Sequence, residues 1–266
     1  MAKFGFIGVG NMGGALAMAA AKVLSSNDIL VSAKHPQHAQ AFAQKYGAAP
    51  IDNLAIAREA DFVILGVKPQ FMEEVLAELQ PILLARNRVV LVTMAAGLTM
   101  ENIAHMAGGR FPVIRIMPNT PAKVGQGVIL YDRNDLVSQS DLNEFLNVLK
   151  YAGRFDHLPE RLIDAGSAVA GCGPAFTYLF LEALADGGVA CGLPRTKSLE
   201  YAAQTLLGSA QLLLETGEHP GALKDAVCSP GGSTIQGVRA LERGGLRGAV
   251  IEAVIAAYEK NKEFIH

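Results

Sequence analysis

Short apolar runs alternate with longer amphipathic ones over residues 1–155. The short runs are almost continuously apolar, which is typical of strands covered on both faces. They predict strands over residues 3–7, 28–32, 61–67, 88–93, 112–116 and 127–131. Helical spacing of apolar residues predicts helices over residues 13–25, 36–46, 70–84, 99–107 and 138–150. This alternation predicts an α/β domain of the Rossmann type, with a parallel, doubly wound sheet that binds ligands outside the carboxyl ends of its strands.

The pattern changes after Arg154, where runs of strand length rich in β-branched residues are no longer found. Helical patterns over about 160–190, 196–216 and 238–264 are rich in Ala, Leu and Gly. We therefore predict a dinucleotide-binding domain over residues 1–155 and an all-α domain over residues 156–266. Small residues recur along these helices and permit close helix–helix approach. A helical domain with so many apolar residues must bury its surface, which predicts a subunit interface. An ordinary closed helical bundle is the alternative.

Composition and charge exclude some classes of protein. Of the 266 residues, 50% are hydrophobic and 18% are charged, which favours a buried core over disorder. Residues 1–155 contain 14 basic and 12 acidic residues, and the rest of the chain contains 9 and 13. Neither part has the basic excess of a nucleic-acid binder, so any anionic ligand needs a local site.

The three cysteines, Cys172, Cys191 and Cys228, lack the spacing of metal ligands. Together with the absence of a signal sequence at the N-terminus, they predict free thiols in the cytoplasm and no bound metal. Glu and Gln side chains interrupt the apolar stretches 199–214 and 249–258. We therefore expect a soluble protein that does not span a membrane.

A glycine loop follows the first predicted strand. In "FGFIGVGNMGGAL", Gly8, Gly10 and Gly13 have the spacing Gly-x-Gly-x-x-Gly between a strand ending at Ile7 and a helix beginning near Met12. Glycine there allows a tight turn, backbone approach to a pyrophosphate and helix–strand packing, while the helix N-terminus offers N–H groups to the phosphates. The loop predicts dinucleotide binding; a glycine-rich turn without a ligand is the alternative.

The end of the second predicted strand bears on the choice of dinucleotide. Enzymes that prefer NAD usually have an Asp or Glu there, which binds the ribose 2′-OH. This chain has Ser32, Ala33, Lys34 and His35 at that end, and Asp28 lies at the opposite end of the strand. A hydroxyl and a cation suit a 2′-phosphate, so we predict that NADPH is preferred and that NADH is the second choice. Lys34 as a merely solvated residue is the alternative.

Three further loops begin where strands are predicted to end. They are "GVKPQ" at 66–70, "TMAAGLT" at 93–99 and "MPNTP" at 117–121. A nicotinamide ring and its ribose would lie at this edge of the sheet. Asn119, between two prolines, is predicted either to bind the cofactor or simply to stiffen the turn.

A proton donor for carbonyl reduction is hard to find in this sequence. Such a donor is usually a His, Lys or Tyr with a tuned pKa. The histidines are outside the predicted strand ends and recognisable catalytic motifs, and are expected at the surface or at helix ends: His35, His38, His105, His157, His219 and His266. An imine that arrives protonated needs only a hydride at carbon, so a substrate of this kind would explain the missing acid.

The segment "CSPGGSTIQG" at 228–237 interrupts the helical part of the chain. Its Pro-Gly-Gly turn leads into a helix predicted to begin near Ser233. An exposed helix N-terminus beside bare glycines presents N–H groups to a carboxylate. The hydroxyls of Ser229 and Thr234 can add hydrogen bonds to that carboxylate or to a ring nitrogen. Ser233 as a plain helix N-cap is the alternative.

Over essentially its whole length the chain resembles the pyrroline-5-carboxylate reductase family. The resemblance rests on six motifs, of which "CSPGGSTIQG" is the most specific; the others are "GFIGVGNMGGAL" (5–16), "GVKPQ" (66–70), "MPNTP" (117–121), "GCGPAF" (171–176) and "ALADGGVACGLPR" (183–195). It implies reduction of 1-pyrroline-5-carboxylate to L-proline, the last step of proline biosynthesis, with NADPH or NADH. It also implies a homodimer with intertwined C-terminal domains, and such dimers often assemble into decamers.

The resemblance also implies which residues form the site. The dinucleotide would be bound by residues at the strand ends: Ile7, Gly8, Val9, Gly10, Asn11, Met12, Ser32, Lys34, Asn53, Gly66, Val67, Lys68, Pro69, Ala95, Ala96 and Gly97, to which we add Asn119. The substrate would be bound by Ser229, Gly231, Gly232, Ser233 and Thr234, with Ser229 and Thr234 as the catalytic residues. In the family, this substrate loop from one subunit lies over the nicotinamide bound by the other, and the threonine hydroxyl reaches the ring nitrogen.

Two departures from the family pattern concern hydroxyl groups. Cys172 stands where members commonly have Ser, and Cys228 where they often have Thr. Both replacements are small, so they put in doubt only whether these two positions contribute a hydrogen bond.

The alternative functions are those of a β-hydroxyacid dehydrogenase, of another imine reductase, and of a protein that binds the dinucleotide without catalysis. β-Hydroxyacid dehydrogenases have a similar glycine loop but need a lysine in the first long helix of the second domain, and residues 171–188 contain none. A protein that only binds the dinucleotide would have no need of the loop at 229–234. An assay of reduced-nicotinamide absorbance with the imine separates such a sensor from a reductase.

Overall fold

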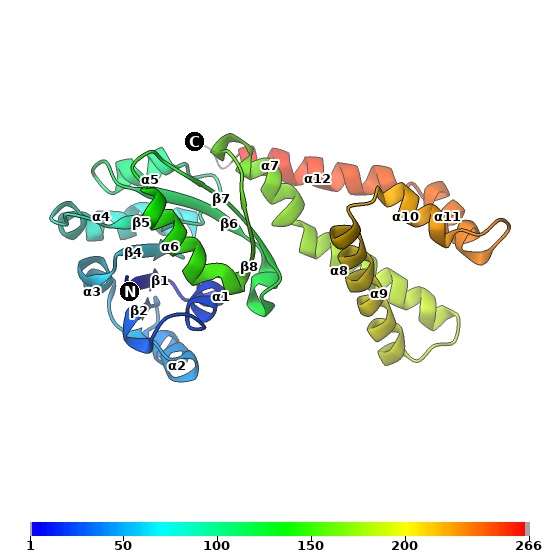
Figure 1. Ribbon diagram of the computed structural model, residues 1–266, viewed down its shortest axis with the longest axis horizontal. Helices are drawn as coiled ribbons and strands as arrows, with labels where there is room; N and C mark the ends of the chain where they lie inside the picture. Colours follow the sequence, from blue (N-terminus) through cyan, green and yellow to red (C-terminus); the bar gives the residue numbers. More distant parts are fainter. Residues whose placement is uncertain (1, 264–266) are drawn as a thin grey trace. The chain divides into compact units, whose positions relative to one another are not determined.

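The chain folds into two compact units. The structure is a computed structural model that describes residues 2–263. The first unit comprises Met1–Cys172 and the chain end from Ala257, and the second comprises Gly173–Ala256 (Figure 1). This division differs from the predicted ranges 1–155 and 156–266, because helix α7 (Glu160–Ala170) packs through Ile163 on the sheet of the first unit. That residues 1–155 bind the dinucleotide and residues 156–266 form the dimer and bind the substrate stays a prediction.

The first unit is built on an eight-stranded sheet with the strand order β3-β2-β1-β4-β5-β6-β7-β8. All six predicted strands are present, and β3 and β8 are additional. The strands are β1 (Phe4–Ile7), β2 (Ile29–Ser32), β3 (Ala49–Pro50), β4 (Phe62–Leu65), β5 (Val90–Thr93), β6 (Val113–Pro118), β7 (Gly127–Arg133) and β8 (Gly153–His157). The predicted Rossmann-type sheet is therefore confirmed.

The strand order reverses between β1 and β4, and this reversal positions the site. Ile7 at the end of β1 pairs in parallel with Ser32 of β2 on one side and with Leu65 of β4 on the other. The carboxyl ends of these three strands therefore lie side by side. In doubly wound sheets a ligand crevice opens at such a point, because the connections leave the two neighbouring strands in opposite directions.

The predicted parallel arrangement ends at β6, because β7 runs antiparallel to β6, and β8 is parallel to β7. Only residues 119–126 connect β6 to β7, including the short 3-10 helix η3 (Thr120–Val124). A parallel crossover needs about a dozen residues or more, so this short connection permits only an antiparallel return. Gly125 ends η3 with a φ of 76°, a conformation that favours glycine.

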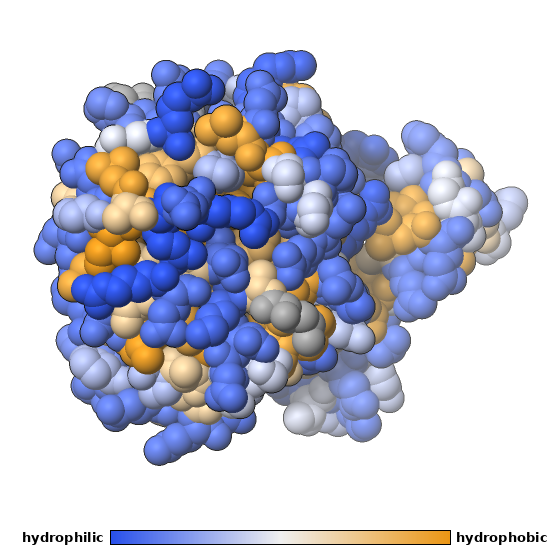
Figure 2. All heavy atoms as spheres, turned by 60° about the vertical axis from the view of Figure 1, so that its left-hand side comes forward, coloured by the Kyte–Doolittle hydropathy of each residue, from blue (hydrophilic) through white to orange (hydrophobic). Residues whose placement is uncertain are grey.

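Helices cover both faces of the sheet (Figure 1). One face carries α1 (Asn11–Ala20), α2 (Pro36–Tyr46) and α6 (Gln139–Leu149), and the other carries α3 (Asn53–Glu59), α4 (Met72–Leu84) and α5 (Met100–Met106). Two separate apolar clusters result, because strands such as β1 and β4 are buried on both sides. Figure 2 brings the left-hand side of Figure 1 forward, and the surface seen there is mostly hydrophilic, with hydrophobic residues in small groups.

Side chains cap several of these helices, but α1 has no such cap. Asp52 Oδ1 accepts a hydrogen bond from Ala55 N (2.7 Å) at the start of α3, and Thr99 Oγ1 accepts one from Asn102 N (3.1 Å) at the start of α5. The N-cap of α1 is Gly10, which has no side chain. The N–H groups of its first turn are therefore left for another acceptor.

The second half of the chain is helical, as predicted, but it is divided into more and shorter helices than predicted. The predicted helix over 160–190 is broken at Gly171, where Ser167 O accepts from both Gly171 N and Cys172 N. The predicted helix over 238–264 is likewise broken, by Gly244 and Gly245, and one helix was missed altogether. The helices are α7, α8 (Gly173–Ala190), α9 (Arg195–Thr216), α10 (Pro220–Val227), α11 (Ser233–Arg243) and α12 (Leu246–Lys262).

The second unit has almost no core of its own. Helices α8 and α9 pack together through Ser198, whose Oγ donates to Ala185 O (2.6 Å). A Cβ on Gly188 would collide with that hydroxyl, so the close approach requires glycine. Ala185, Ser198 and Ala202 are the buried residues of α8 and α9, and the described parts of α10, α11 and α12 have none.

One stretch of the described residues passes a test for a membrane span by length and composition. Glu160–Ala190, which is α7 followed by α8, reaches a mean hydropathy of 1.4 over an 18-residue window that is 11% buried. A membrane span was not predicted from the sequence. An exposed apolar helix is also what an unpaired subunit interface presents.

Candidate functional site: a dinucleotide cavity and a second anion-binding loop

The glycine loop after β1 brings two strand ends into close backbone contact. Gly8 has a φ of 97°, and a Cβ placed on it would lie 2.8 Å from Gly66 O at the end of β4. A Cβ on Gly13 would collide with Gly8 O, where α1 crosses the loop. Two of the predicted glycines are thus required by the packing of the protein itself.

Gly10 differs, because a Cβ placed on it would have no protein atom within 4 Å. The space beside Gly10 is open, and the uncapped N-terminus of α1 faces it with the N–H groups of its first turn. A pyrophosphate fits both features, since it needs close backbone approach and N–H donors. The residues present therefore suit the phosphates of a nicotinamide dinucleotide.

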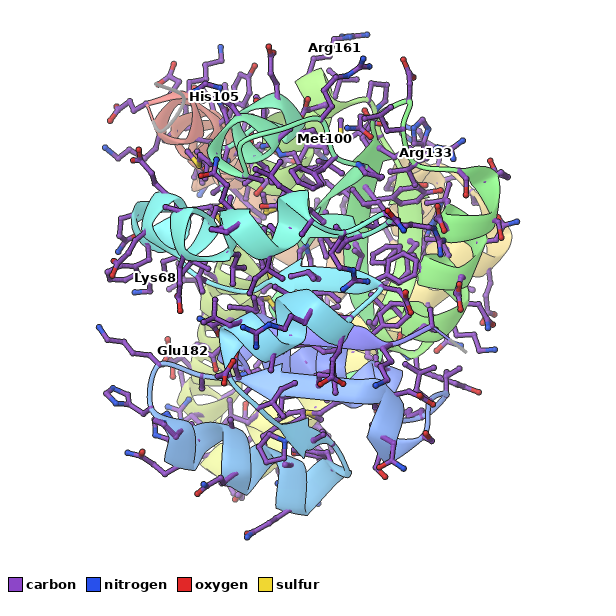
Figure 3. All side chains as sticks on the ribbon, turned by 90° about the vertical axis from the view of Figure 1, so that its left-hand side faces the viewer. Lys68, Met100, His105, Arg133, Arg161 and Glu182 are labelled. Atoms are coloured by element: carbon purple, nitrogen blue, oxygen red, sulfur yellow. The ribbon has the colours of Figure 1, made fainter. Side chains whose placement is uncertain are left out.

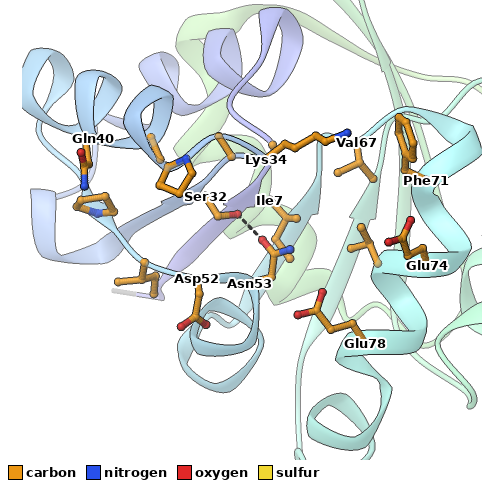
Figure 4. Close-up of a pocket in the computed structure, with 17 residues that line it drawn as sticks. Ile7, Ser32, Lys34, Gln40, Asp52, Asn53, Val67, Phe71, Glu74 and Glu78 are labelled. Carbon is orange, nitrogen blue, oxygen red and sulfur yellow. Dashed lines mark hydrogen bonds between the residues drawn. The ribbon is translucent and has the colours of Figure 1, made fainter.

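A cavity of about 630 Å³ continues from this loop along the carboxyl end of β2 (Figure 4). Its volume lies within the range of about 300–1,000 Å³ that small-molecule sites occupy. Six of the predicted cofactor residues line it: Ile7, Gly8, Ser32, Lys34, Asn53 and Val67. The structure therefore brings the glycine loop, the end of β2 and the start of α3 together around one cavity.

Ser32 and Asn53 form a polar pair on the wall of this cavity. Ser32 Oγ donates to Asn53 Oδ1 over 2.6 Å, and Figure 4 shows the bond across the cavity wall. Asn53 is the first residue of α3 and is placed by the Asp52 cap. Because its oxygen is engaged by Ser32, its amide nitrogen is left to donate to a ligand. A ribose hydroxyl or a phosphate oxygen would satisfy it.

Several residues on the α4 side of the cavity were not predicted from the sequence. Phe71, Glu74 and Glu78 are spaced at helical intervals and line the cavity from this side (Figure 4). Lys34 Nζ lies 5.3 Å from the centroid of the Phe71 ring. Their helical spacing indicates that they share one face of α4. The sequence alone does not reveal that this face is turned to β2. The remaining residues missed in the lining are Ala33, Pro36, Ala39, Gln40, Pro50, Ile51, Asp52 and Val75.

Other predicted cofactor residues follow the ends of β4 and β5, outside this cavity. Lys68 and Pro69 are exposed in the loop before α4, where Figure 3 labels Lys68. Ala95 is buried, and its N–H donates to Thr93 Oγ1 (3.3 Å), while Gly97 has a φ of 76°. Their contact with the cofactor stays a prediction, as it does for Val9, Asn11, Met12, Gly66 and Ala96.

Asn119 has two backbone partners in the structure. Its Oδ1 accepts from Val128 N (2.9 Å) and its Nδ2 donates to Ala170 O (2.9 Å) at the end of α7. The side chain is buried and joins the end of β6 to β7 and α7. These bonds leave at most one N–H of Asn119 for a ligand, so its direct contact with the cofactor stays a prediction.

Lys123 also lies near the glycine loop and was missed. Its Nζ donates to Asn11 Oδ1 over 3.0 Å, so the segment after β6 is tied to the start of α1. A cation beside an uncapped helix N-terminus adds positive potential where the pyrophosphate is expected. One lysine within a mostly apolar segment gave no signal of this contact in the sequence.

The loop Ser229–Thr234 lies in the second unit and ends at an uncapped helix start. Gly231 has a φ of 71°, Gly232 N donates to Ser229 O (3.0 Å), and a Cβ on Gly232 would collide with Ser229 Oγ. Helix α11 begins at Ser233 with Gly232 as its N-cap and no side-chain hydrogen bond. The alternative that Ser233 is the N-cap is therefore wrong. The first-turn N–H groups can receive an anion.

The hydroxyl residues of this loop are open to solvent. Ser229, Ser233 and Thr234 are exposed, whereas Gly232 is half-buried. Upstream, the pKa of Lys224 on α10 is raised, mainly by its side-chain hydrogen bond with Asp225. This hydrogen bond stabilises the protonated form of the lysine, and Asp225 offsets its charge. The loop has the donors needed for a carboxylate, and its substrate role stays a prediction.

The cysteines are free thiols and the described histidines lie at the surface of residues 2–263. Cys172, Cys191 and Cys228 are free thiols, the first and last half-buried. His35, His38, His105, His157 and His219 are exposed, and Figure 3 shows His105 at the edge of the first unit; His266 lies outside the described residues. Within the same range, groups of three or more His, Cys, Asp or Glu that could hold a metal were not found.

Comparison with protein families matches both parts of the chain. Residues 160–264 match the family described as "Pyrroline-5-carboxylate reductase dimerisation", and residues 3–97 match "NADP oxidoreductase coenzyme F420-dependent". The pyrroline-5-carboxylate reductase of Escherichia coli K12 is 40% identical over 265 residues, covering 98% of this chain and 97% of its own. That of Glycine max is 40% identical over 263 residues, covering 97% and 94%.

Solved structures agree with these matches. A pyrroline-5-carboxylate reductase from Coxiella burnetii has a TM-score of 0.91 and 32% identity, covering 100% of this chain and 99% of its own. The pyrroline carboxylate reductase of Plasmodium falciparum, with NADP bound, has a TM-score of 0.89 and 31% identity, covering 100% and 98%. A prephenate dehydrogenase from Aquifex aeolicus, at 13% identity and a TM-score of 0.52, shares only the fold.

Proposed function

Because the chain belongs to the pyrroline-5-carboxylate reductase family, we propose that the cavity of the first unit binds the dinucleotide and that the loop Ser229–Thr234 of the second unit binds the substrate. The enzyme reduces 1-pyrroline-5-carboxylate to L-proline with a reduced nicotinamide dinucleotide, in proline biosynthesis. The assignment of the cofactor to one site and the substrate to another is best supported by two helix starts. Helices α1 and α11 both have a glycine N-cap, Gly10 and Gly232, and no side-chain hydrogen bond to their first turn. The first suits a pyrophosphate and the second a carboxylate.

The protein's part in the reaction is mainly to bind and orient. When bound, the reduced nicotinamide supplies a hydride to the imine carbon. The first-turn N–H groups of α11 and the Ser229 hydroxyl hold the substrate carboxylate. Thr234 Oγ1 accepts a hydrogen bond from the protonated ring nitrogen and fixes the ring. The substrate arrives as an iminium ion, so the C=N bond becomes a C–N bond without a proton from the protein.

The cofactor proposal is that NADPH is preferred and that NADH is accepted. Ser32, Lys34 and Asn53 gather at the end of β2, where the 2′-position of the adenosine ribose is expected. The Lys34 ammonium and the free amide nitrogen of Asn53 can both donate to a phosphate, while the Ser32 hydroxyl donates to Asn53 Oδ1 and holds that side chain in place. A carboxylate at the end of β2, the usual partner of a 2′-OH, is not found there.

Lys34→Met is expected to lower kcat/KM for NADPH about tenfold and to leave the value for NADH nearly unchanged. A hydrogen bond to a charged group contributes about 1.5 kcal/mol at the lower end of its range, and about 1.4 kcal/mol corresponds to one decade. Steady-state kinetics with both cofactors at saturating imine measure the two values. Equal loss with NADPH and NADH would show that Lys34 does not meet the 2′-phosphate.

We further propose a homodimer with intertwined helical units, able to assemble into a decamer. The second unit leaves large apolar side chains exposed, including Leu179 (67%), Leu214 (73%) and Val227 (66%). A unit with so few buried residues gains its core from another protein surface. The match of residues 160–264 to a dimerisation family favours a second copy over a membrane as that surface. We also propose the cytoplasm as its location, consistent with three free cysteines.

A complementation experiment tests whether the loop acts on the partner's cofactor. Gly10→Ala is proposed to disable only the cofactor site, and Thr234→Ala only the substrate loop. In a heterodimer with sites shared between subunits, one site carries both changes and the other carries neither. Co-expressed, differently tagged subunits are therefore expected to be far more active than either homodimer. If each subunit used its own loop, both sites would be defective and the heterodimer would be as slow as the homodimers.

A further inference from the structure

An aromatic ring and an ammonium group lie together on the lining of the dinucleotide cavity. Lys34 extends from the end of β2 and Phe71 lies just before α4, and Lys34 Nζ is 5.3 Å from the ring centroid (Figure 4). Both residues line the cavity, and Phe71 is 42% exposed although it is large and apolar. A cation over an aromatic face within about 6 Å is attracted by the negative face of the ring.

The same cavity contains carboxylates that could compete for this lysine. Asp52, Glu74 and Glu78 all line it. Among residues 2–263, however, the ion pairs do not include Lys34, and its contact is with the Phe71 ring. A carboxylate partner would neutralise the ammonium charge. An aromatic ring carries no net charge, so it places the lysine and leaves its charge available to an anion.

We propose that Phe71 is a positioning residue for cofactor choice: its ring holds the Lys34 ammonium over the cavity, ready for the 2′-phosphate of NADPH. Phe71 need not touch the phosphate, because it acts through Lys34. The inference rests on the proposed function, in which Lys34 meets the 2′-phosphate. It predicts that loss of the ring harms NADPH selectively, since NADH has a hydroxyl at that position and gains little from an ammonium.

The test compares Phe71→Leu with Phe71→Tyr. Leucine keeps apolar bulk without a ring, and tyrosine keeps the ring. An exposed cation–π contact corresponds to about a two- to fivefold effect. We expect Phe71→Leu to lower kcat/KM for NADPH by about two- to fivefold, with NADH unchanged, and Phe71→Tyr to retain the wild-type ratio. Tyr151→Leu is a matched control, since Tyr151 holds Lys22 and Lys150 in similar contacts outside the cavity.

A binding measurement separates this role from a general structural one. Calorimetry with 2′-phospho-ADP-ribose and with ADP-ribose reports the 2′-phosphate contribution without turnover. The proposal expects Phe71→Leu to weaken only the phosphorylated ligand. Equal weakening of both ligands would mean that the ring packs on the adenine, and unchanged binding of both would mean that it has no role; either result overturns the proposal.

Lys34→Met distinguishes failure of this inference from failure of the premise. If Lys34→Met lowers the NADPH preference while Phe71→Leu does not, Lys34 meets the phosphate without help from the ring, and only the inference fails. If neither variant changes the preference, the proposed role of Lys34 fails as well. Since the expected Phe71 effect acts through Lys34, the Phe71→Leu change in a Lys34→Met background should add nothing.

Discussion

Gly10→Ala is expected to weaken the binding of NADPH and NADH alike by about 100-fold or more, while the protein stays folded. A Cβ at Gly10 meets no protein atom within 4 Å, and its φ of −74° lies outside the left-handed region that favours glycine. The new methyl group therefore points into the space proposed for the pyrophosphate. Loss of two hydrogen bonds from first-turn N–H groups to the charged pyrophosphate, at about 1.5 kcal/mol each, corresponds to about two decades in affinity.

Gly13→Ala is the matched comparison for this prediction. Its Cβ would collide with Gly8 O inside the protein, so this variant is expected to lose stability together with binding. Fluorescence titration with NADPH and thermal unfolding of both variants separate the two effects. Were Gly10→Ala to bind NADPH with wild-type affinity, the open space beside Gly10 would not be the pyrophosphate site.

Burial explains which strands could be predicted from the sequence. All residues of β1, β2, β4 and β5 are buried, so their apolar runs are continuous and easy to recognise. Strand β8 has the sequence GRFDH, lies at the edge of the sheet and is partly exposed, so it gave no apolar run. Its pairing with β7, rather than its composition, makes it a strand. Local pattern therefore predicts central strands better than edge strands.

Strand direction was harder to predict than strand position. The apolar run of β7 was recognised, but an apolar run does not specify whether a strand is parallel or antiparallel to its neighbour. The short connection over residues 119–126 contained that information, because it leaves no room for a crossover. Loop length between two predicted strands was therefore the neglected signal.

The candidate site was predictable where it depends on the backbone and not where it depends on long-range packing. Gly8 and Gly13 are required by close approaches that a local spacing rule already describes. The two partners of Asn119 lie 9 and 51 residues away, so its tethering role needed the tertiary structure. Phe71 likewise meets Lys34 only because α4 packs beside the end of β2.

Thr234→Ala is expected to lower kcat by about one to two decades, with little change in NADPH affinity. The loss corresponds to one hydrogen bond to a charged group, about 1.5–3 kcal/mol. Thr234 is exposed in the first turn of α11, beside the uncapped N-terminus, where its hydroxyl is free for a ligand. Cofactor affinity should be retained because Thr234 is proposed to contact the substrate and is not among the residues that line the dinucleotide cavity. Single-turnover reduction of the imine and titration with NADPH measure the two quantities.

Thr234→Ser tests whether the hydroxyl itself is responsible. Serine keeps the oxygen and loses only the methyl group, so most of the activity should return if Thr234 binds the ring nitrogen. A helix-start defect would instead leave both variants slow and would lower the unfolding temperature, which circular dichroism detects. If Thr234→Ala turned over at the wild-type rate, Thr234 would have no part in the reaction. The substrate nitrogen would then need another partner, for which the exposed hydroxyl of Ser229 is the next candidate within the same loop.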